Sequence, residues 1–160
     1  MSHSGYRRAL PVAAAVLVLD QLSKWWVLEL MQPPRQIELA PFLNLVLAWN
    51  RGVSFSLFHS DADYAPYALS ALAAAVVVGL LWWLRQTTRV WPALGIGLVI
   101  GGAVGNVVDR LRFGAVVDFI DVHAAGWHWP AFNLADSAIT VGVVLLIADG
   151  LFGRPDEAKT

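Results

Sequence analysis

Four apolar stretches dominate the pattern of the chain, at residues 9–31, 66–84, 92–108 and 134–152. Each approaches the roughly 20 residues that a helix needs to cross a bilayer. Soluble core helices would each show a polar face, which the stretches at 66–84 and 92–108 lack. The pattern therefore predicts an all-α integral membrane bundle of four transmembrane helices. Residues 1–160 are expected to form a single membrane domain.

The two long connections, residues 32–65 and 109–133, are predicted to be outer loops. Within the first, "FLNLVLAWNRGVSFSLF" at 42–58 alternates with period two on both sides of an Asn- and Gly-containing bend, which is typical of a short hairpin. A second strand-like piece is "AVVDFIDV" at 115–122. We therefore expect a small β-ribbon or cradle in the outer loop, with its apolar face on the membrane surface.

The N-terminal stretch is interpreted as a retained helix and not as a cleaved signal peptide. Arg7 and Arg8 precede the apolar run, as in a signal peptide, but Asp20, Gln21 and Lys24 follow without a small-residue cleavage pattern. Hydrophobicity then resumes.

The distribution of Lys and Arg predicts the direction of the spans. These residues gather in the two tails and in the short connection at 85–91, as Arg7, Arg8, Arg85, Arg89, Arg154 and Lys159. The longer connections hold only Arg35, Arg51, Arg110 and Arg112. Because cytoplasmic loops carry the excess of basic residues, both termini are expected in the cytoplasm. The long loops then face the periplasm or cell exterior.

Composition agrees with a membrane protein and excludes several other classes. Hydrophobic residues make up 58% of the chain, charged residues only 14%, and the eight tryptophans suit interfacial belts. The net charge of −1 gives no reason to expect nucleic acid. The absence of cysteine excludes disulfides, thiolate nucleophiles and cysteine-ligated metals.

Small residues at every fourth position predict close helix packing. Gly97, Gly101 and Gly105 recur in this way in the third span. The same spacing occurs at Ala75, Gly79, Ala138 and Gly142. We expect a tight monomeric bundle, with homodimerisation through the glycine face as the alternative.

Ionisable residues inside a span cost a few kcal/mol, so each requires a reason. Asp20 and Lys24 lie one turn apart in the order that favours an ion pair. Alternatively, Asp20 faces the bundle centre and binds a backbone group of a partner or substrate. Asn106, Asp109 and Arg110 share one helix face, where Asp109 would neutralise an arginine that reaches the headgroups.

Asn133 and Asp136 begin the last span. Asn133 suits the N-cap and Asp136 the N3 position of a capping box, and capping alone would explain both. However, Asp118 lies 18 residues earlier, in the outer loop, so the two acids are expected at similar depth. Asp149 lies 13 residues further along the span, about 20 Å deeper, and cannot join them.

Two carboxylates in contact share one proton, so that one can act as a base and the other as an acid. Such a pair can activate water against a peptide carbonyl and protonate the departing amine. Other protease chemistries find no support, because the chain has no His-Glu-x-x-His, no cysteine and no Gly-x-Ser-x-Gly. A metal site built from Asp118, Asp121, His123 and His128 is conceivable but not favoured, so we predict neither metal nor cofactor.

Five sequence blocks in order resemble those of the bacterial lipoprotein signal peptidases (signal peptidase II). They are "LDQLSK" at 19–24, "WNRGVSFS" at 49–56, "GNVVDR" at 105–110, "VVDF" at 116–119 and "FNLADSAI" at 132–139. The resemblance spans nearly the whole chain. The departure is "WNRG", where "YNTG" or "RNTG" is more usual.

The resemblance implies an intramembrane aspartyl endopeptidase of the bacterial inner membrane. It would remove signal peptides from prolipoproteins by cleaving before the cysteine that carries a diacylglyceryl group, and globomycin would inhibit it. The family's catalytic pair falls on Asp118 and Asp136. Its supporting residues fall on Asp20, Asn50, Gly52, Asn106, Arg110 and Asn133. From the helix dipole, we predict that Asp136 is the base and Asp118 the proton donor.

Two other functions remain open on the residues alone. A small membrane transporter or proton relay could use Asp20, Asp109 and Asp136 as intramembrane carboxylates along a water path. A non-catalytic membrane scaffold would use the acids only as caps and ion pairs.

Overall fold

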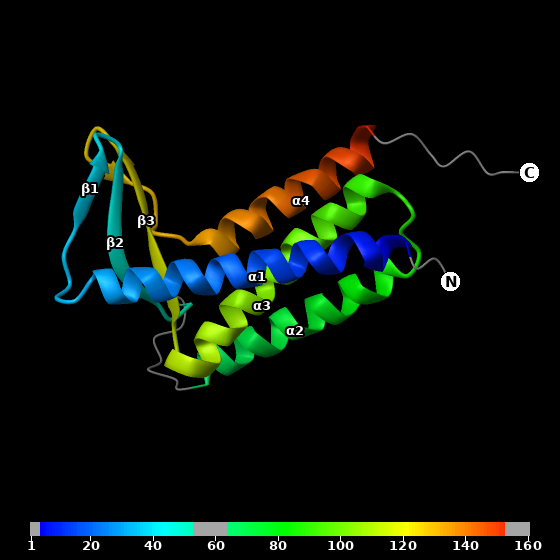
Figure 1. The fold of residues 1–160 in the computed structure, drawn as a ribbon, viewed down its shortest axis with the longest axis horizontal. Helices are drawn as coiled ribbons and strands as arrows, with labels where there is room; N and C mark the ends of the chain where they lie inside the picture. Colours follow the sequence, from blue (N-terminus) through cyan, green and yellow to red (C-terminus); the bar gives the residue numbers. More distant parts are fainter. Residues whose placement is uncertain (1–3, 53–63, 153–160) are drawn as a thin grey trace, which may run out of the picture.

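The computed structural model describes residues 4–52 and 64–152. It contains four helices that are long and apolar enough to cross a membrane, with a small antiparallel sheet at one end (Figure 1). The helices are α1 (Ser4–Leu30), α2 (Ala65–Leu84), α3 (Val90–Phe113) and α4 (Leu134–Phe152). The strands are β1 (Ile37–Ala40), β2 (Leu43–Asn50), β3 (Val116–Ala124) and β4 (Trp127–His128).

Helix α3 is longer than its apolar stretch. The outer connection was expected to begin at residue 109, but the helix continues through Asp109 and Arg110 to Phe113. Basic residues in the last turn, Arg110 and Arg112, favour this extension because they lie at the negative end of the helix dipole. Gly114 then ends the helix in the left-handed conformation, with φ of 69°.

Glycines let α3 pack closely between its neighbours. A Cβ at Gly97 or Gly101 would lie 2.6 Å from a backbone oxygen of α1. A Cβ at Gly102 would overlap the Ala135 carbonyl oxygen of α4. The glycine face of α3 is therefore packed against α1 and α4 of the same chain. Close helix packing was also expected at Gly79 of α2. This expectation was wrong, because a Cβ at Gly79 would meet nothing within 4 Å.

The sheet has the strand order β1-β2-β3-β4, with neighbouring strands antiparallel. In the pairing of β2 with β3, Leu45 lies opposite Ile120 and Trp49 lies opposite Val117, with a bulge in β2 between Leu45 and Ala48. The hairpin expected over 42–58 is described only in its first arm, whose partners are β1 and β3; residues 53–58 lie outside the described residues.

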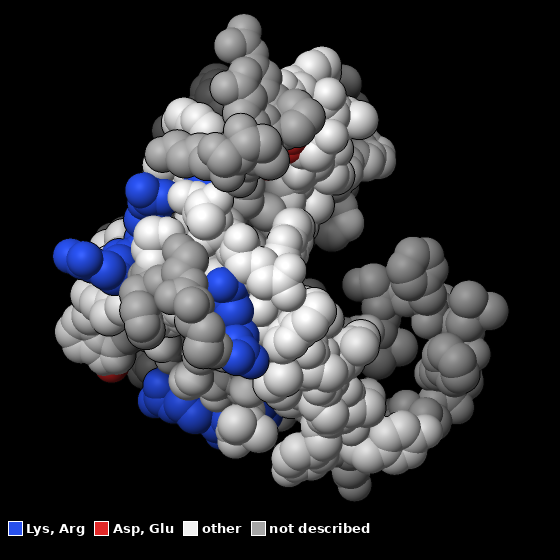
Figure 2. Space-filling view, turned by 90° about the vertical axis from the view of Figure 1, so that its right-hand side faces the viewer, with Lys and Arg blue, Asp and Glu red and all other residues white. Residues whose placement is uncertain are grey.

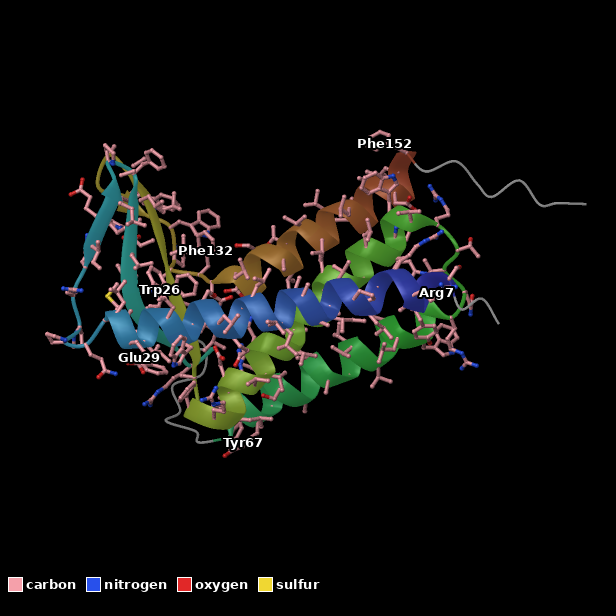
Figure 3. The ribbon with its side chains drawn as sticks, viewed as in Figure 1. Arg7, Trp26, Glu29, Tyr67, Phe132 and Phe152 are labelled. Atoms are coloured by element: carbon pink, nitrogen blue, oxygen red, sulfur yellow. The ribbon has the colours of Figure 1, made fainter. Side chains whose placement is uncertain are left out.

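The segment between the sheet and α4 is bonded to β3. The carbonyl of Phe132 accepts hydrogen bonds from the N–H groups of Phe119 and Ile120, and its own N–H donates to the Ile120 carbonyl. Figure 3 shows Phe132 between the sheet and the start of α4. This bridge brings residue 133 beside residue 118.

The start of α1, the end of α4 and the connection between α2 and α3 all lie at the end of the bundle opposite the sheet (Figure 1). Lys and Arg side chains gather on the face that this end presents (Figure 2). Arg89 pairs there with Asp149 at 2.8 Å, and Arg8 donates to the Thr88 carbonyl at 2.6 Å. The bundle thus has one basic end and one end that carries the sheet.

Candidate functional site

The site begins with the cap of α4. The Asn133 Oδ1 accepts the Asp136 N–H at 2.9 Å, and the Asp136 Oδ2 accepts the Asn133 N–H at 3.3 Å. These reciprocal bonds form the capping box that the sequence predicts. Asp136 is thereby held in the first turn of a helix, where the dipole favours a negative charge.

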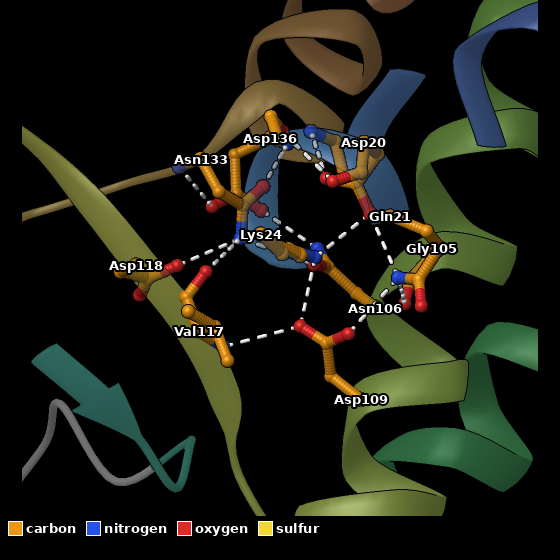
Figure 4. A network of polar contacts seen from close by, with 12 residues as sticks. Asp20, Gln21, Lys24, Gly105, Asn106, Asp109, Val117, Asp118, Asn133 and Asp136 are labelled. Carbon is orange, nitrogen blue, oxygen red and sulfur yellow. Dashed lines mark hydrogen bonds and ion pairs between the residues drawn. The ribbon is translucent and has the colours of Figure 1, made fainter. Parts of the chain in front are cut away.

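The same asparagine reaches the second carboxylate. Its Nδ2 donates to Asp118 Oδ1 at 2.7 Å, and also lies 3.3 Å from the Val117 carbonyl. Asn133 is completely buried. Within the described part of the chain, the link between Asp118 and Asp136 therefore runs through Asn133 (Figure 4).

Asn106 on α3 supplies the next contact. Its Nδ2 donates to Asp136 Oδ1 at 2.8 Å. Its Oδ1 accepts from Lys24 Nζ at 3.1 Å and from Asn133 Nδ2 at 3.2 Å. Because two donors face its oxygen, the amide can direct only its nitrogen toward Asp136.

A buried lysine lies at the centre of this polar network. Lys24 Nζ is 2.9 Å from Asp20 Oδ2 and 2.8 Å from Asp109 Oδ2. Asp20 also accepts the Ala135 N–H at 3.0 Å. The ion pair of Asp20 with Lys24 is therefore confirmed. The backbone group that Asp20 binds belongs to α4 of the same chain, and its binding to a partner or substrate stays a prediction. Asp109, which was expected to neutralise Arg110, forms its ion pair with Lys24 instead.

Asn50 approaches from the sheet. Its Nδ2 donates to Asp118 Oδ2 at 2.9 Å, and its Oδ1 accepts the Gly52 N–H at 2.8 Å. Gly52 has φ of 84°, a conformation that side chains disfavour, so its part is to complete the turn that orients Asn50.

The surroundings of Asp118 change its pKa. Burial, reinforced by the charge of Asp136, raises the pKa of Asp118 from its ordinary value of 3.8 to about 6. The hydrogen bonds from Asn50 and Asn133 oppose this shift without cancelling it. Asp118 thus holds a proton to a higher pH than an ordinary aspartate does.

Asp121 lies three residues further along β3 and belongs to a different cluster. Its Oδ2 accepts from Asn44 at 2.9 Å, and its Oδ1 lies 2.8 Å from His128 Nδ1. These two bonds, that of Asn44 first, lower the pKa of Asp121. Residues an odd number apart in a strand face opposite sides, so Asp121 points away from Asp118.

Arg110 lies at the edge of the network, and Asp149 lies far from it, as the sequence predicts. Arg110 is half-buried and reaches only the carbonyl of Asn106, at 3.5 Å, while its Nε has no hydrogen-bond partner among the described residues. Asp149 lies at the opposite end of the bundle, paired with Arg89. Residues 4–52 and 64–152 contain no group of three or more His, Asp or Glu side chains placed to hold a metal.

Comparison with known proteins assigns the family. The family model described as signal peptidase (SPase) II matches residues 12–152. The chain belongs to the signal peptidase II family. The resemblance drawn from the five sequence blocks is therefore confirmed.

Relatives within the signal peptidase II family match nearly end to end. The lipoprotein signal peptidase of Methylorubrum extorquens is 43% identical, over 98% of this chain and 93% of its own length. That of Paraburkholderia phymatum is 45% identical, over 89% and 86%. A solved bacterial membrane enzyme superposes with a TM-score of 0.80 at 28% identity, covering 91% of this chain and 94% of that one. Together with the four apolar helices, these matches identify a bacterial multi-pass membrane protein.

In this member of the signal peptidase II family, Gln21 and Lys24 make more contacts with the network than the sequence indicates. Gln21 donates to Asp20 at 3.2 Å and to Asp109 at 3.0 Å. Lys24 contacts Asp20 on its own helix and Asn106 and Asp109 on α3. The available signal was the helical spacing of Asp20, Gln21 and Lys24. It does not reveal that Asp109, 85 residues after Lys24, is the second carboxylate.

Proposed function

We propose that the protein is an intramembrane aspartyl endopeptidase that cleaves diacylglyceryl-modified prolipoproteins just before the lipidated cysteine, with Asp118 and Asp136 as its catalytic pair. The observation that carries the proposal is the place of Asn133 where the sheet meets the bundle: its side-chain Nδ2 donates to the Asp118 carboxylate, and its backbone N–H donates to the Asp136 carboxylate. Membership of the signal peptidase II family supplies the substrate class.

The different environments of the two acids support different roles. Asp136 accepts N–H groups from Asn106 and Asn133 at a helix N-terminus, which favours its anion. Asp118 is 1% exposed, and its pKa is raised to about 6 by burial and the charge of Asp136. An apolar substrate that displaces water further favours its protonated form. Asp136 therefore acts as the base and Asp118 as the proton donor.

In the reaction, Asp136 takes a proton from water as the water oxygen bonds to the scissile carbonyl carbon. Asp118 then gives its proton to the amide nitrogen, and the C–N bond breaks to release the amine. The proton held by Asp136 is returned to Asp118, which resets the pair. Asn50 supports Asp118 through Oδ2, and Asn106 supports Asp136 through Oδ1. No metal or other cofactor takes part.

The arrangement suits a lipidated substrate. Asp118 lies on β3 and Asp136 in the first turn of α4. These elements meet at the sheet end of the bundle (Figure 1). At that end the acyl chains would remain in lipid while the scissile bond reaches the interface with water. Arg110 and Gly52 lie at the edge of the network and contribute to binding the peptide. Exposed aromatic side chains at this end, among them Trp26 and Trp49, suit contact with the membrane interface.

The basic end opposite the sheet supports the proposed orientation, because an excess of Lys and Arg marks the cytoplasmic side (Figure 2). The enzyme would lie in the bacterial inner membrane with both termini in the cytoplasm and its site near the periplasmic face. It would act as a monomer and bind globomycin.

Cleavage of a lipidated precursor by the purified protein in lipid or detergent tests the function. Asp118→Asn and Asp136→Asn should each abolish cleavage, with Asp149→Asn as the matched control at the opposite end of the bundle. Turnover retained in either of the first two variants would contradict the pair. A proton resolved on Asp136, for instance by neutron diffraction with an inhibitor bound, would reverse the assignment of base and donor.

The alternative of a transporter or proton relay finds less support. Asp20, Lys24, Asp109, Asp118 and Asp121 are the buried charged residues in the described part of the chain. They gather toward the sheet end, whereas a relay needs groups through the full depth of the bilayer. Substrate-coupled flux in liposomes without precursor cleavage would favour it.

A further inference from the structure

The peptide groups that precede Asp118 are held by side chains. On the edge of β3 that faces the helices, the Val117 N–H donates to Asp109 Oδ2 at 3.1 Å. The Val117 carbonyl accepts from Asn133 Nδ2 at 3.3 Å. A strand edge ordinarily satisfies these groups with another strand or water. Here Asp109 and Asn133 replace the neighbouring strand immediately before the catalytic residue.

One oxygen of Asp109 performs two tasks. Oδ2 accepts the Val117 N–H and also faces Lys24 Nζ at 2.8 Å, while Oδ1 accepts from Gln21 Nε2 at 3.0 Å. Asp109 is 1% exposed and Lys24 is 3% exposed. The ammonium of Lys24 therefore fixes the carboxylate that binds the strand (Figure 4).

We infer that Asp109, held by Lys24 and Gln21, is a positioning residue that anchors β3 and thereby sets the place of Asp118. This inference rests on the proposed function of Asp118 as a catalytic residue. Asp109 exchanges no proton with the substrate. Its partners are the Val117 N–H, Lys24 and Gln21, and neither catalytic carboxylate is among them.

Asp109→Asn separates anchoring from proton transfer. An asparagine Oδ1 in the place of Oδ2 can still accept both the Val117 N–H and Lys24. Its Nδ2 then faces Gln21 Nε2, so the bond to Gln21 is lost, while Gln21 keeps its bonds to Asp20 and to the Gly105 carbonyl. The variant therefore keeps the anchor of β3, but it has no group at position 109 that can give or take a proton. We expect kcat within about tenfold of the wild type, since the Val117 N–H and Lys24 both keep their acceptor and only the bond to Gln21 is lost.

Asp109→Leu has a similar volume but no acceptor. The Val117 N–H then loses its partner, and β3 is free to shift beside α3. A displacement of about 1 Å at a catalytic group can cost roughly 100-fold in rate. We expect kcat to fall by about that factor with little change in KM, because the surface that binds the precursor is untouched.

The experiment measures kcat and KM on a lipidated precursor for the wild type, Asp109→Asn and Asp109→Leu, together with hydrogen exchange of the Val117 amide. The expected result is slow exchange in Asp109→Asn and faster exchange in Asp109→Leu, in step with kcat. The inference is overturned if Asp109→Asn is as inactive as Asp118→Asn while its Val117 amide is still protected from exchange. So does a full kcat in Asp109→Leu.

Failure of the proposed function would look different, because the wild type itself would then not cleave the precursor. Should Asp109→Leu fail to fold, as judged by its elution and circular dichroism, Asp109→Asn decides alone. Its activity supports positioning, and its inactivity in a folded, protected state refutes it.

Discussion

Asn133 and Asp118 are joined by a hydrogen bond of 2.7 Å from the Asn133 amide to the carboxylate, although they belong to the cap of α4 and to β3. The oxygen of the same amide caps α4 through the Asp136 N–H. One side chain therefore caps the start of α4 and also holds the Asp118 carboxylate. These tasks can be separated by substitution.

Replacement of Asn133 should separate stability from activity. Asn133→Ala removes both the cap and the bridge, and should lower the free energy of unfolding by about 1 kcal/mol. Asn133→Ser restores a capping oxygen but cannot donate to Asp118 as the amide does. We expect near-normal stability in Asn133→Ser but a kcat reduced about 100-fold in both variants. Thermal unfolding and precursor cleavage check this; full activity in Asn133→Ser would show that the bridge is dispensable.

The raised pKa of Asp118 should make stability depend on pH in a particular direction. The folded protein binds this proton up to about pH 6, while the unfolded chain releases it near the ordinary value of 3.8. The free energy of unfolding should therefore decrease as the pH rises through this window, by on the order of 2–3 kcal/mol from this group. The difference in unfolding between the wild type and Asp118→Asn from pH 4 to pH 7 measures it. An unchanged difference across that range would contradict the shifted pKa.

The same group should shape the pH profile of the reaction. If Asp118 donates the proton, kcat/KM in the free enzyme should fall about tenfold per pH unit above about 6, because the proton is lost. If it were the base, the rate would instead rise toward that pH. The profile of initial rates at low precursor concentration distinguishes the two, and Asp149→Asn should reproduce the wild-type curve.

Replacing a glycine of α3 by alanine should reduce stability much more than replacing the glycine of α2. Gly102→Ala places a Cβ against the Ala135 carbonyl oxygen of α4, so the helices must separate. We expect a loss of roughly 1–3 kcal/mol in unfolding free energy. Gly79→Ala meets nothing within 4 Å and should be neutral or stabilising by up to about 1 kcal/mol. Unfolding in detergent micelles tests both; equal effects would contradict the packing.

The two aspartates of β3 should behave differently. Asp121→Asn retains an acceptor for Asn44 and lies on the opposite face of the strand from Asp118, so cleavage should remain within a few-fold of the wild type. Asp118→Asn should abolish it. A matched assay of the two variants decides the point, and loss of turnover in both would implicate Asp121 in the chemistry.

The sequence was informative where the determinants are local. Hydropathy located the four spans because each forms its helix from contiguous residues, and the spacing of Asn133 and Asp136 revealed the capping box. The extension of α3 to Phe113 was missed, because its last turn is amphipathic and hydropathy measures lipid exposure instead of helicity. In "VVDFIDV" the apolar and polar residues do not alternate, so Asp118 and Asp121 are placed on opposite sides only by the strand that this segment forms.

The sequence was silent where partners are distant. Lys24 could be paired with Asp20 from helical spacing, but its second partner Asp109 follows from the packing of α1 on α3. Asp109 next to Arg110 in the chain suggested a pair that the helix geometry does not form. Similarly, Asp109 binds the backbone N–H of Val117. Every residue except proline has this group, so the sequence cannot indicate the bond.

The bond between Asp20 and the Ala135 N–H joins the earliest helix to the last one. During synthesis Asp20 and Lys24 enter the bilayer long before their later partners are translated. The proposed proteolytic centre is therefore complete only when α4 inserts, and a partly made chain in the membrane would have no assembled cutting site with which to damage its neighbours.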